Sequence, residues 1–191
     1  MQLFLIRHPA PRIAPGTCYG RSDLELRESP AALAAEVATL LPAATCLFSS
    51  PLQRCRELAL AISAEAVIDE RLVEMDFGEW ELRAWNEINR DGIDRWAAAP
   101  FDFAPPGGES AMAMATRVIA FAREQLAPRG RSIAVVSHHG PLRVLAAIML
   151  GQPRESWLSL SFEQGTVSLV EVGDHGAAFR YRNHRPIAQH R

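Results

Sequence analysis

Three short apolar runs set the strongest limit on how this 191-residue chain can fold. They cover residues 3–6, 45–48 and 133–136, and none of them contains a charged side chain. A run of this length and character is typical of a strand that is buried on both faces, as in a parallel sheet covered by helices. Segments with helical periodicity separate the runs, so the sequence predicts an α/β fold with a largely parallel central sheet.

Four helices are expected from apolar residues that recur at helical spacing. They run from about residue 30 to residue 41, after Pro51, from about Ser110, and after Pro141. Ser50 is the expected N-cap of the second helix, with Pro51 at its first position, since these residue types favour those places.

The end of the chain alternates in polarity between residues 158 and 181. This pattern predicts two edge strands joined by a turn at residues 173–176. Because 48% of the residues are apolar and the composition shows no break, residues 1–191 are expected to form a single domain.

Composition and charge argue against several classes of protein. A formal net charge of -2 without a cationic run disfavours binding to nucleic acid, although isolated arginines can still hold one phosphate. The apolar stretches are too short for a membrane span and the first residues do not resemble a signal peptide, so we expect a cytoplasmic protein without membrane contact. Three cysteines with no paired spacing indicate neither a disulfide framework nor a zinc site.

The residues whose side chains could take part in a reaction follow the predicted strands. The first run ends at Arg7 and His8, the second leads one helical turn onward to Arg54, and the third ends at His138. Ligands of such sheets bind at the carboxyl ends of the strands, so these side chains are expected to meet. Guanidinium groups match phosphate oxygens, and a neutral imidazole can attack phosphorus; the set therefore predicts phosphoryl transfer with His8 as nucleophile.

The leaving alkoxide of such a reaction needs a proton from an acid on the side opposite the nucleophile. Glu74, which follows the apolar pair Leu72 and Val73 and precedes Gly78, is the expected donor. Once ionised, the same carboxylate would activate the water that hydrolyses the phosphohistidine. No cofactor is expected, and the partner would be a small phosphorylated metabolite.

Each of these residues also has an ordinary structural explanation. An Arg-His pair after a strand often occurs by chance, and Glu74 and Arg54 alone would be taken for surface residues. His138 and His139 could be structural or could suggest a metal, but neighbours on an extended segment point apart and no HxH or HExxH pattern is present, so no metal is expected. The phosphoryl site is favoured because one fold would gather all the candidates.

The chain resembles the histidine phosphatase superfamily, also called the phosphoglycerate mutase-like fold, over nearly its whole length. The matching blocks are LIRH at 5–8, SSPLQRC at 49–55, LVEMDFGEWE at 72–81, PGGES at 106–110 and VSHHG at 136–140. The resemblance implies a three-layer αβα sandwich. It also implies His8 as nucleophile, Glu74 as proton donor, and a phosphate pocket of Arg7, Arg54 and His138. His139, the neighbour of His138, is also expected to bind the phosphate.

Within the superfamily the chain looks most like the α-ribazole phosphatases of cobalamin biosynthesis. The similarity lies in residues 80–83 after the acidic block, in Gln164-Gly165 and in the closing segment 183–187. It implies α-ribazole phosphate or adenosylcobalamin phosphate as the substrate. Trp80 and Trp85 are the rings expected to stack on an aromatic leaving group, the alternative being that they are core residues.

Three positions depart from the family pattern. Pro9 stands where glycine usually follows the histidine, Ala14 stands where some relatives place asparagine, and His139 replaces a common glycine. Pro9 removes one backbone N–H that could face the phosphate, which bears on affinity and not on the chemistry.

Other functions stay open from the sequence alone. A broad-specificity phosphatase and a mutase would use the same residues, although no extended segment that could enclose a mutase intermediate is visible. A non-catalytic phosphate-binding module would need neither His8 nor Glu74, so their presence argues against it. The oligomeric state is also open, a homodimer included.

Overall fold

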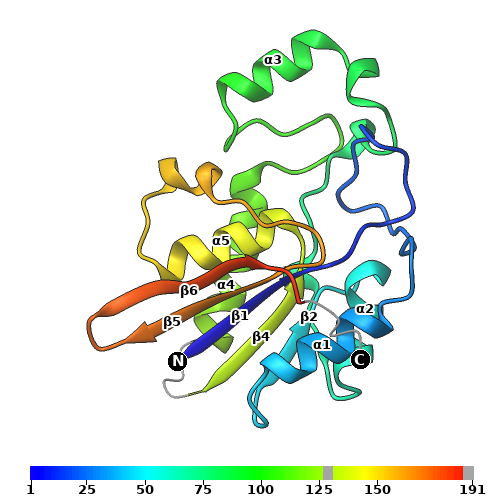
Figure 1. Cartoon of the computed structure of the whole chain (residues 1–191). Coiled ribbons are helices and arrows are strands. Elements are labelled where there is room, and N and C mark those ends of the chain that lie inside the picture. The colour runs from blue at the N-terminus through cyan, green and yellow to red at the C-terminus, as the bar shows by residue number, and fades with distance from the viewer. Residues whose placement is uncertain (127–130, 187–191) are drawn as a thin grey trace.

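The computed structural model describes residues 1–126 and 131–186 and is built on a six-stranded sheet (Figure 1). The strand order is β3-β2-β4-β1-β5-β6. The strands are β1 (Gln2–Arg7), β2 (Cys46–Ser49), β3 (Val67–Ile68), β4 (Ser132–Ser137), β5 (Val167–Gly173) and β6 (Gly176–His184). Pairing is parallel from β3 to β1 and antiparallel at β5 and β6, which confirms the predicted mostly parallel α/β fold.

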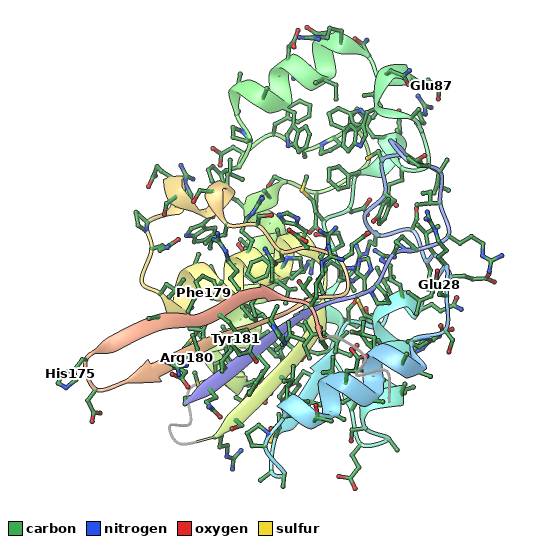
Figure 2. The ribbon with its side chains drawn as sticks, viewed as in Figure 1. Glu28, Glu87, His175, Phe179, Arg180 and Tyr181 are labelled. Atoms are coloured by element: carbon green, nitrogen blue, oxygen red, sulfur yellow. The ribbon has the colours of Figure 1, made fainter. Side chains whose placement is uncertain are left out.

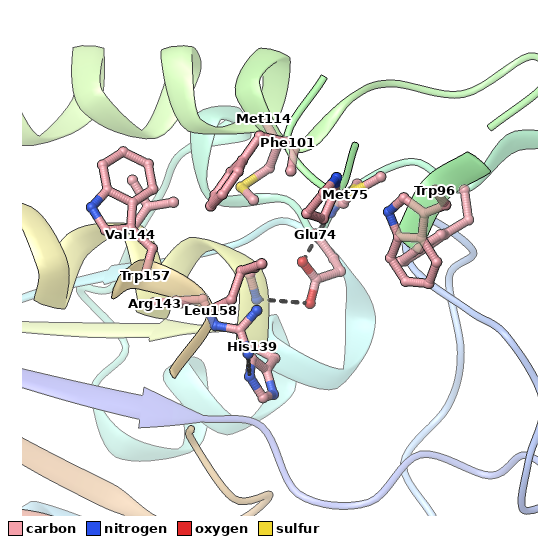
Figure 3. Close-up of a pocket in the computed structure, with 14 residues that line it drawn as sticks. Glu74, Met75, Trp96, Phe101, Met114, His139, Arg143, Val144, Trp157 and Leu158 are labelled. Carbon is pink, nitrogen blue, oxygen red and sulfur yellow. Dashed lines mark hydrogen bonds between the residues drawn. The ribbon is translucent and has the colours of Figure 1, made fainter. Parts of the chain in front are cut away.

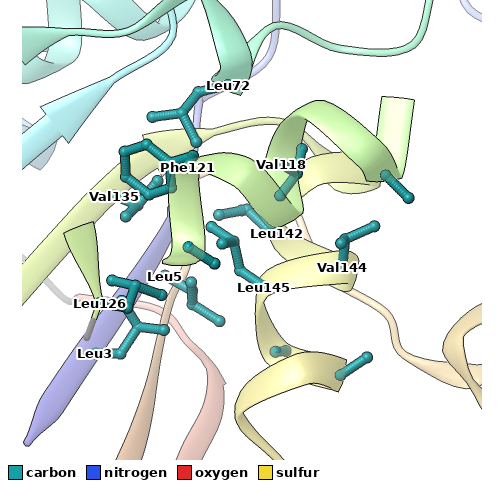
Figure 4. Close-up of a cluster of buried hydrophobic side chains, with 14 of the residues drawn as sticks. Leu3, Leu5, Leu72, Val118, Phe121, Leu126, Val135, Leu142, Val144 and Leu145 are labelled. Carbon is teal, nitrogen blue, oxygen red and sulfur yellow. The ribbon is translucent and has the colours of Figure 1, made fainter. Parts of the chain in front are cut away.

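Helices cover both faces of the sheet and make three layers (Figure 1). The covering helices are α1 (Ala31–Leu40) and α2 (Gln53–Ile62) on one face, and α4 (Ala111–Gln125) and α5 (His139–Met149) on the other. Phe4 and Ile6 of β1 pack toward α1 and α2, whereas Leu3 and Leu5 pack toward α4 and α5 (Figure 4). Both faces of β1 are therefore buried, which is why its sequence is continuously apolar.

The segment between β3 and α4 lies beyond the end of the sheet (Figure 1). It contains α3 (Arg90–Ala98), which the sequence pattern did not predict, and the short 3-10 helices Glu70–Leu72, Gly78–Trp80 and Trp85–Glu87. A fourth 3-10 helix, Arg154–Ser159, follows α5. Among the residues described, no helix is both long and apolar enough to cross a membrane.

The prediction of two edge strands at the end of the chain was partly wrong. β5 lies inside the sheet, paired with both β1 and β6, and its first four residues are buried. The part from Leu158 to Thr166 is a 3-10 end and a loop, and the strand begins only at Val167. Ile187 of the closing segment is outside the described residues.

β6 contains a bulge that turns its side chains over. Phe179 packs in the cluster under α4 and α5, whereas Tyr181, two positions on, packs in the cluster under α1 and α2 (Figure 2). The pairing shifts from Val170 with Phe179 to Leu169 with Tyr181, so Arg180 is the extra residue. A bulge of one residue lets a single edge strand contribute to both cores.

Two helices start away from the predicted positions. α2 begins at Gln53, whose backbone N–H donates to Asp23 Oδ1 at 2.6 Å, while Ser50 Oγ accepts from Leu52 at 3.3 Å. The cap comes from a distant loop that no local pattern reveals. α5 begins at His139, two residues before Pro141.

The larger core should depend strongly on Phe121. This ring is fully buried and meets Phe48 edge-on with 5.2 Å between ring centroids. We expect Phe121→Ala to lower the free energy of unfolding by about 3–5 kcal/mol in urea titrations, because it removes contacts and leaves a cavity. Leu60→Ala, at a side chain 47% exposed on α2, is the control and should change it by less than about 0.5 kcal/mol. Equal losses in the two variants would contradict this account of the core.

Candidate active site

The register of the sheet brings the predicted site residues to one edge. Arg7, the last residue of β1, pairs with Ser137, the last residue of β4. The residue that follows each of these strands is a histidine, and the ring centroids of His8 and His138 lie 5.1 Å apart. Arg54 enters from the first turn of α2 and is fully buried beside them.

His8 is held as a neutral imidazole with one defined tautomer. Its Nδ1 lies 2.7 Å from the carbonyl oxygen of Pro9, and since a carbonyl can only accept, Nδ1 carries the proton. Burial, followed by the charge of Arg54, lowers the pKa of His8 well below its usual value. The lone pair of Nε2 is therefore the one left for chemistry.

His138 is the N-cap residue of α5 and is fully buried. Its Nε2 lies 2.8 Å from Ser50 Oγ, so the serine expected to cap α2 instead orients this ring. Burial lowers the pKa of His138 well below its usual value, and the charge of Arg54 and the neighbouring His8 act in the same direction.

Arg7 and Arg54 carry positive charge into the site, and neither has a carboxylate partner among residues 1–126 and 131–186. Arg7 Nη1 donates to the carbonyl of Phe162 at 2.6 Å, and Arg54 donates to the carbonyls of Ser22 at 2.8 Å and Gly20 at 2.5 Å. The Nε atoms of both are buried without a hydrogen-bond partner in the part of the chain that the structure describes. The site is thus suited to an anion with several acceptor oxygens.

Glu74 is positioned by backbone amides (Figure 3). Its Oε1 accepts from the N–H of Met75 at 2.9 Å and its Oε2 from the N–H of Gly140 at 3.2 Å, in the first turn of α5. A Cβ on Gly140 would lie 2.4 Å from Oε1, so the close approach of the carboxylate requires glycine there.

His139 lies between two guanidinium groups. Its Nε2 is 2.7 Å from Arg143 Nη2 and its Nδ1 is 3.3 Å from Arg7 Nη1. Because a neutral imidazole has one acceptor nitrogen, the shorter contact is the hydrogen bond, with Arg143 donating. Burial, then the charges of Arg143 and Arg7, lower the pKa of His139 to about 4.

A cavity of about 270 Å³ opens beside Glu74 (Figure 3). Most of its wall is apolar or aromatic, and its only cationic side chain among the described residues is Arg143. The aromatic residues of the wall are Phe77, Trp96, Phe101 and Trp157.

The two rings predicted to stack on a ligand lie elsewhere. Trp80 is buried against Trp96 and Phe103, and Trp85 is 37% exposed and stacks on Trp96 with nearly parallel rings 5.8 Å apart. The cavity wall consists of other residues, Trp96 among them. Three of the four aromatic residues of the wall belong to the aromatic segment after Glu74, but composition could not tell which rings of that segment face the cavity.

Sequence reasoning missed Arg143 and Trp157. Arg143 lies one helical turn after His139, a spacing that could have placed both on one face of α5. Trp157 belongs to a 3-10 helix that begins before the segment predicted as strands, in a part of the chain for which the sequence pattern gave no signal.

Comparison with known proteins identifies the family. The sequence profile of the histidine phosphatase superfamily (branch 1) matches residues 3–185. The chain belongs to the histidine phosphatase superfamily. This membership and the phosphatase relatives make it a phosphoric monoester hydrolase, and the sequence-based identification of the superfamily is confirmed.

Relatives within the histidine phosphatase superfamily align over most of the chain. An adenosylcobalamin/alpha-ribazole phosphatase of Escherichia coli (strain K12) is 28% identical over 198 residues, covering 98% of both chains. Phosphoserine phosphatase 1 of Hydrogenobacter thermophilus is 27% identical and covers 90% of this chain and 87% of its own. The crystal structure of the alpha-ribazole phosphatase from Shigella flexneri superposes with a TM-score of 0.84 at 29% identity, covering 98% of both chains.

The three histidines of the site should stay neutral in mildly acidic solution. At pH 5.5 we expect the imidazole carbon resonances of His8, His138 and His139 to keep neutral shifts in the folded protein, because the pKa of each is lowered. The urea-denatured chain at the same pH is the control, since its histidines titrate near 6.5. Imidazolium shifts in the folded protein would contradict the burial and charge described above.

The same lowered pKa values have a consequence for stability. Below about pH 6.5 the unfolded chain binds protons that the folded site does not. The free energy of unfolding should therefore decrease as the pH is lowered. For His139 this loss extends down to about pH 4.

Proposed function

We propose that the chain hydrolyses a phosphate monoester through a covalent phosphohistidine on His8. The observation that carries this proposal is the neutral, tautomerically fixed imidazole of His8 beside two guanidinium groups, with buried Nε atoms, that have no anionic partner among the described residues. A phosphate dianion would supply the missing negative charge and place phosphorus before a nucleophilic nitrogen.

The first step is an in-line displacement at phosphorus. His8 Nε2 forms a bond to phosphorus while the bond to the ester oxygen breaks, and Arg7, Arg54 and His138 stabilise the equatorial oxygens. Glu74, protonated at this stage, gives its proton to the departing alkoxide. The alcohol then leaves through the cavity beside Glu74.

The second step reverses the role of the carboxylate. Glu74, now ionised, removes a proton from a water molecule as the water oxygen attacks the phosphohistidine. The N–P bond breaks, inorganic phosphate is released, His8 recovers its lone pair, and Glu74 is again protonated. One water is consumed for each ester hydrolysed.

The proposed substrate is α-ribazole phosphate, with adenosylcobalamin phosphate as the larger variant. The aromatic wall of the cavity and the names of the relatives support an aromatic nucleoside as leaving group. A cavity of about 270 Å³ suits a benzimidazole nucleoside better than a whole cobalamin, most of which would stay outside. Phosphoserine, suggested by the name of another relative, would leave the aromatic wall without a partner.

The first test is phosphate release from a panel of esters without added metal. The panel contains α-ribazole phosphate, adenosylcobalamin phosphate, phosphoserine and 3-phosphoglycerate. We expect selective turnover of α-ribazole phosphate, lowered more than about a thousand-fold in His8→Ala because the nucleophile is lost. His184→Ala, at an exposed histidine, is the matched control and should be unchanged. Full activity of His8→Ala would reject the covalent route, and preference for phosphoserine would reject the substrate.

A second test addresses the cavity wall. We expect Trp96→Leu to lower kcat/KM for α-ribazole phosphate about ten-fold, since lost aromatic packing of this kind is worth about 1 kcal/mol or more. The same variant should change kcat/KM for glycerol phosphate little. Trp85→Leu is the comparison, because Trp85 stacks on Trp96 without lining the cavity, and it should have a small effect. A larger loss of kcat/KM in Trp85→Leu than in Trp96→Leu would indicate that Trp85 is the ring that stacks on the substrate.

A further inference from the structure

The segment that carries Glu74 is held by side chains instead of regular secondary structure. The short 3-10 helix before it ends at Leu72, and Glu74 itself is in neither helix nor strand. The carbonyls of residues 71 to 74 nevertheless all accept hydrogen bonds from side chains. An irregular segment of this kind keeps its shape only as well as those donors hold it.

Arg117 of α4 supplies three of the four donors. Its Nη1 donates to the carbonyls of Arg71 at 2.8 Å and Val73 at 2.5 Å, and its Nη2 donates to the carbonyl of Glu74 at 3.0 Å. The planar guanidinium spans these acceptors as a rigid fork, a task that a single ammonium group cannot reproduce. The contacts reach the backbone of Glu74 and not its carboxylate.

Glu109 fixes the guanidinium from the other side. Its Oε1 accepts from Arg117 Nη2 at 2.7 Å and from the backbone N–H of Asp76 at 3.1 Å. The N–H of Glu109 in turn donates to the carbonyl of Asp76 at 2.9 Å. Both side chains of the ion pair are only 19% exposed, so the pair is shielded from solvent more than an ordinary surface pair.

The fourth donor joins this segment to the phosphate pocket. Ser137 Oγ is buried and donates to the carbonyl of Leu72 at 2.7 Å, and Ser137 immediately precedes His138. The segment of the proton donor is therefore attached to the same strand end that presents a phosphate-binding histidine.

We propose that Arg117, fixed by Glu109, is a positioning residue that sets the place of the Glu74 carboxylate relative to the scissile ester oxygen. This inference rests on the proposed function, in which Glu74 is the general acid. A displacement of about 1 Å at a catalytic group can cost about a hundred-fold in rate. Loss of the guanidinium fork would free the backbone at Val73 and Glu74 and so misplace the acid, while His8 and the phosphate pocket stay intact.

The test compares two esters whose leaving groups differ in acidity. Benzyl phosphate releases an alkoxide that needs a proton, whereas p-nitrophenyl phosphate releases a stable phenolate that does not. Both carry an aromatic ring suited to the cavity. Because kcat/KM reports the steps up to release of the alcohol, its ratio between the two esters measures how well the acid is placed.

We expect Arg117→Lys to lower kcat/KM for benzyl phosphate at least about ten-fold more than for p-nitrophenyl phosphate, as general acids contribute about a hundred-fold or more. Glu109→Gln should shift the ratio in the same direction by less. Arg123→Lys, an exposed arginine on the same helix, is the matched control and should leave the ratio unchanged. If Arg117→Lys does not fold, as judged by circular dichroism, Glu109→Gln carries the test.

Glu74→Gln is measured beside these variants so that the acid role of Glu74 and the positioning role of Arg117 can be tested separately. A change of the ratio in Glu74→Gln but not in Arg117→Lys or Glu109→Gln would overturn the positioning role alone. An unchanged ratio in Glu74→Gln would overturn the acid role and the positioning role together. Equal loss on both esters in Arg117→Lys would show a general structural role and would also overturn the inference.

Discussion

Two guanidinium groups lie at one end of the central sheet, that of Arg54 fully buried and that of Arg7 partly buried, and within residues 1–126 and 131–186 no carboxylate lies within ion-pair distance of either. Buried charge without a partner is costly, and here backbone carbonyls offset part of the cost. Phe162 accepts from Arg7, and Gly20 and Ser22 accept from Arg54. Loops that belong to no helix or strand are thereby fixed around the site.

The same positive field explains the state of the histidines. Charge from Arg7 and Arg54 adds to burial in lowering the pKa of His8 and His138, and Arg7 and Arg143 act likewise on His139. A field that attracts a phosphate dianion thus also keeps a nucleophilic imidazole unprotonated. The carboxylate of Glu74 is supported differently, by two backbone amides, and its backbone by Arg117.

The strand ends could be predicted from the sequence because each apolar run stops abruptly at a polar residue. This placed Arg7, His8 and His138 at one edge, and the register of Arg7 with Ser137 brings them there in the structure. The burial of Arg54 could not be predicted in the same way. It results from the loop at residues 20–22, whose position is set by tertiary contacts.

Contacts made across the fold account for the remaining differences. Asp23 caps α2 from a distant loop, which moved the helix start from the position that Ser50 and Pro51 indicated. Arg143 occupies what reads as a polar position of an amphipathic helix, yet it lines the cavity. Local pattern gives the chemistry that a segment can carry, and only packing decides which side chain faces the ligand.

The hydrogen bond from Arg7 to the carbonyl of Phe162 has a consequence for biosynthesis. Arg7 and Phe162 are 155 residues apart, and the N–H of Gly165 donates to the carbonyls of both Arg7 and His8. On the ribosome the strand bearing the nucleophile therefore emerges long before the segment that completes its surroundings. A nascent chain therefore cannot assemble the pocket until residues 162–165 have emerged, and competence to react with cellular phosphate esters requires them.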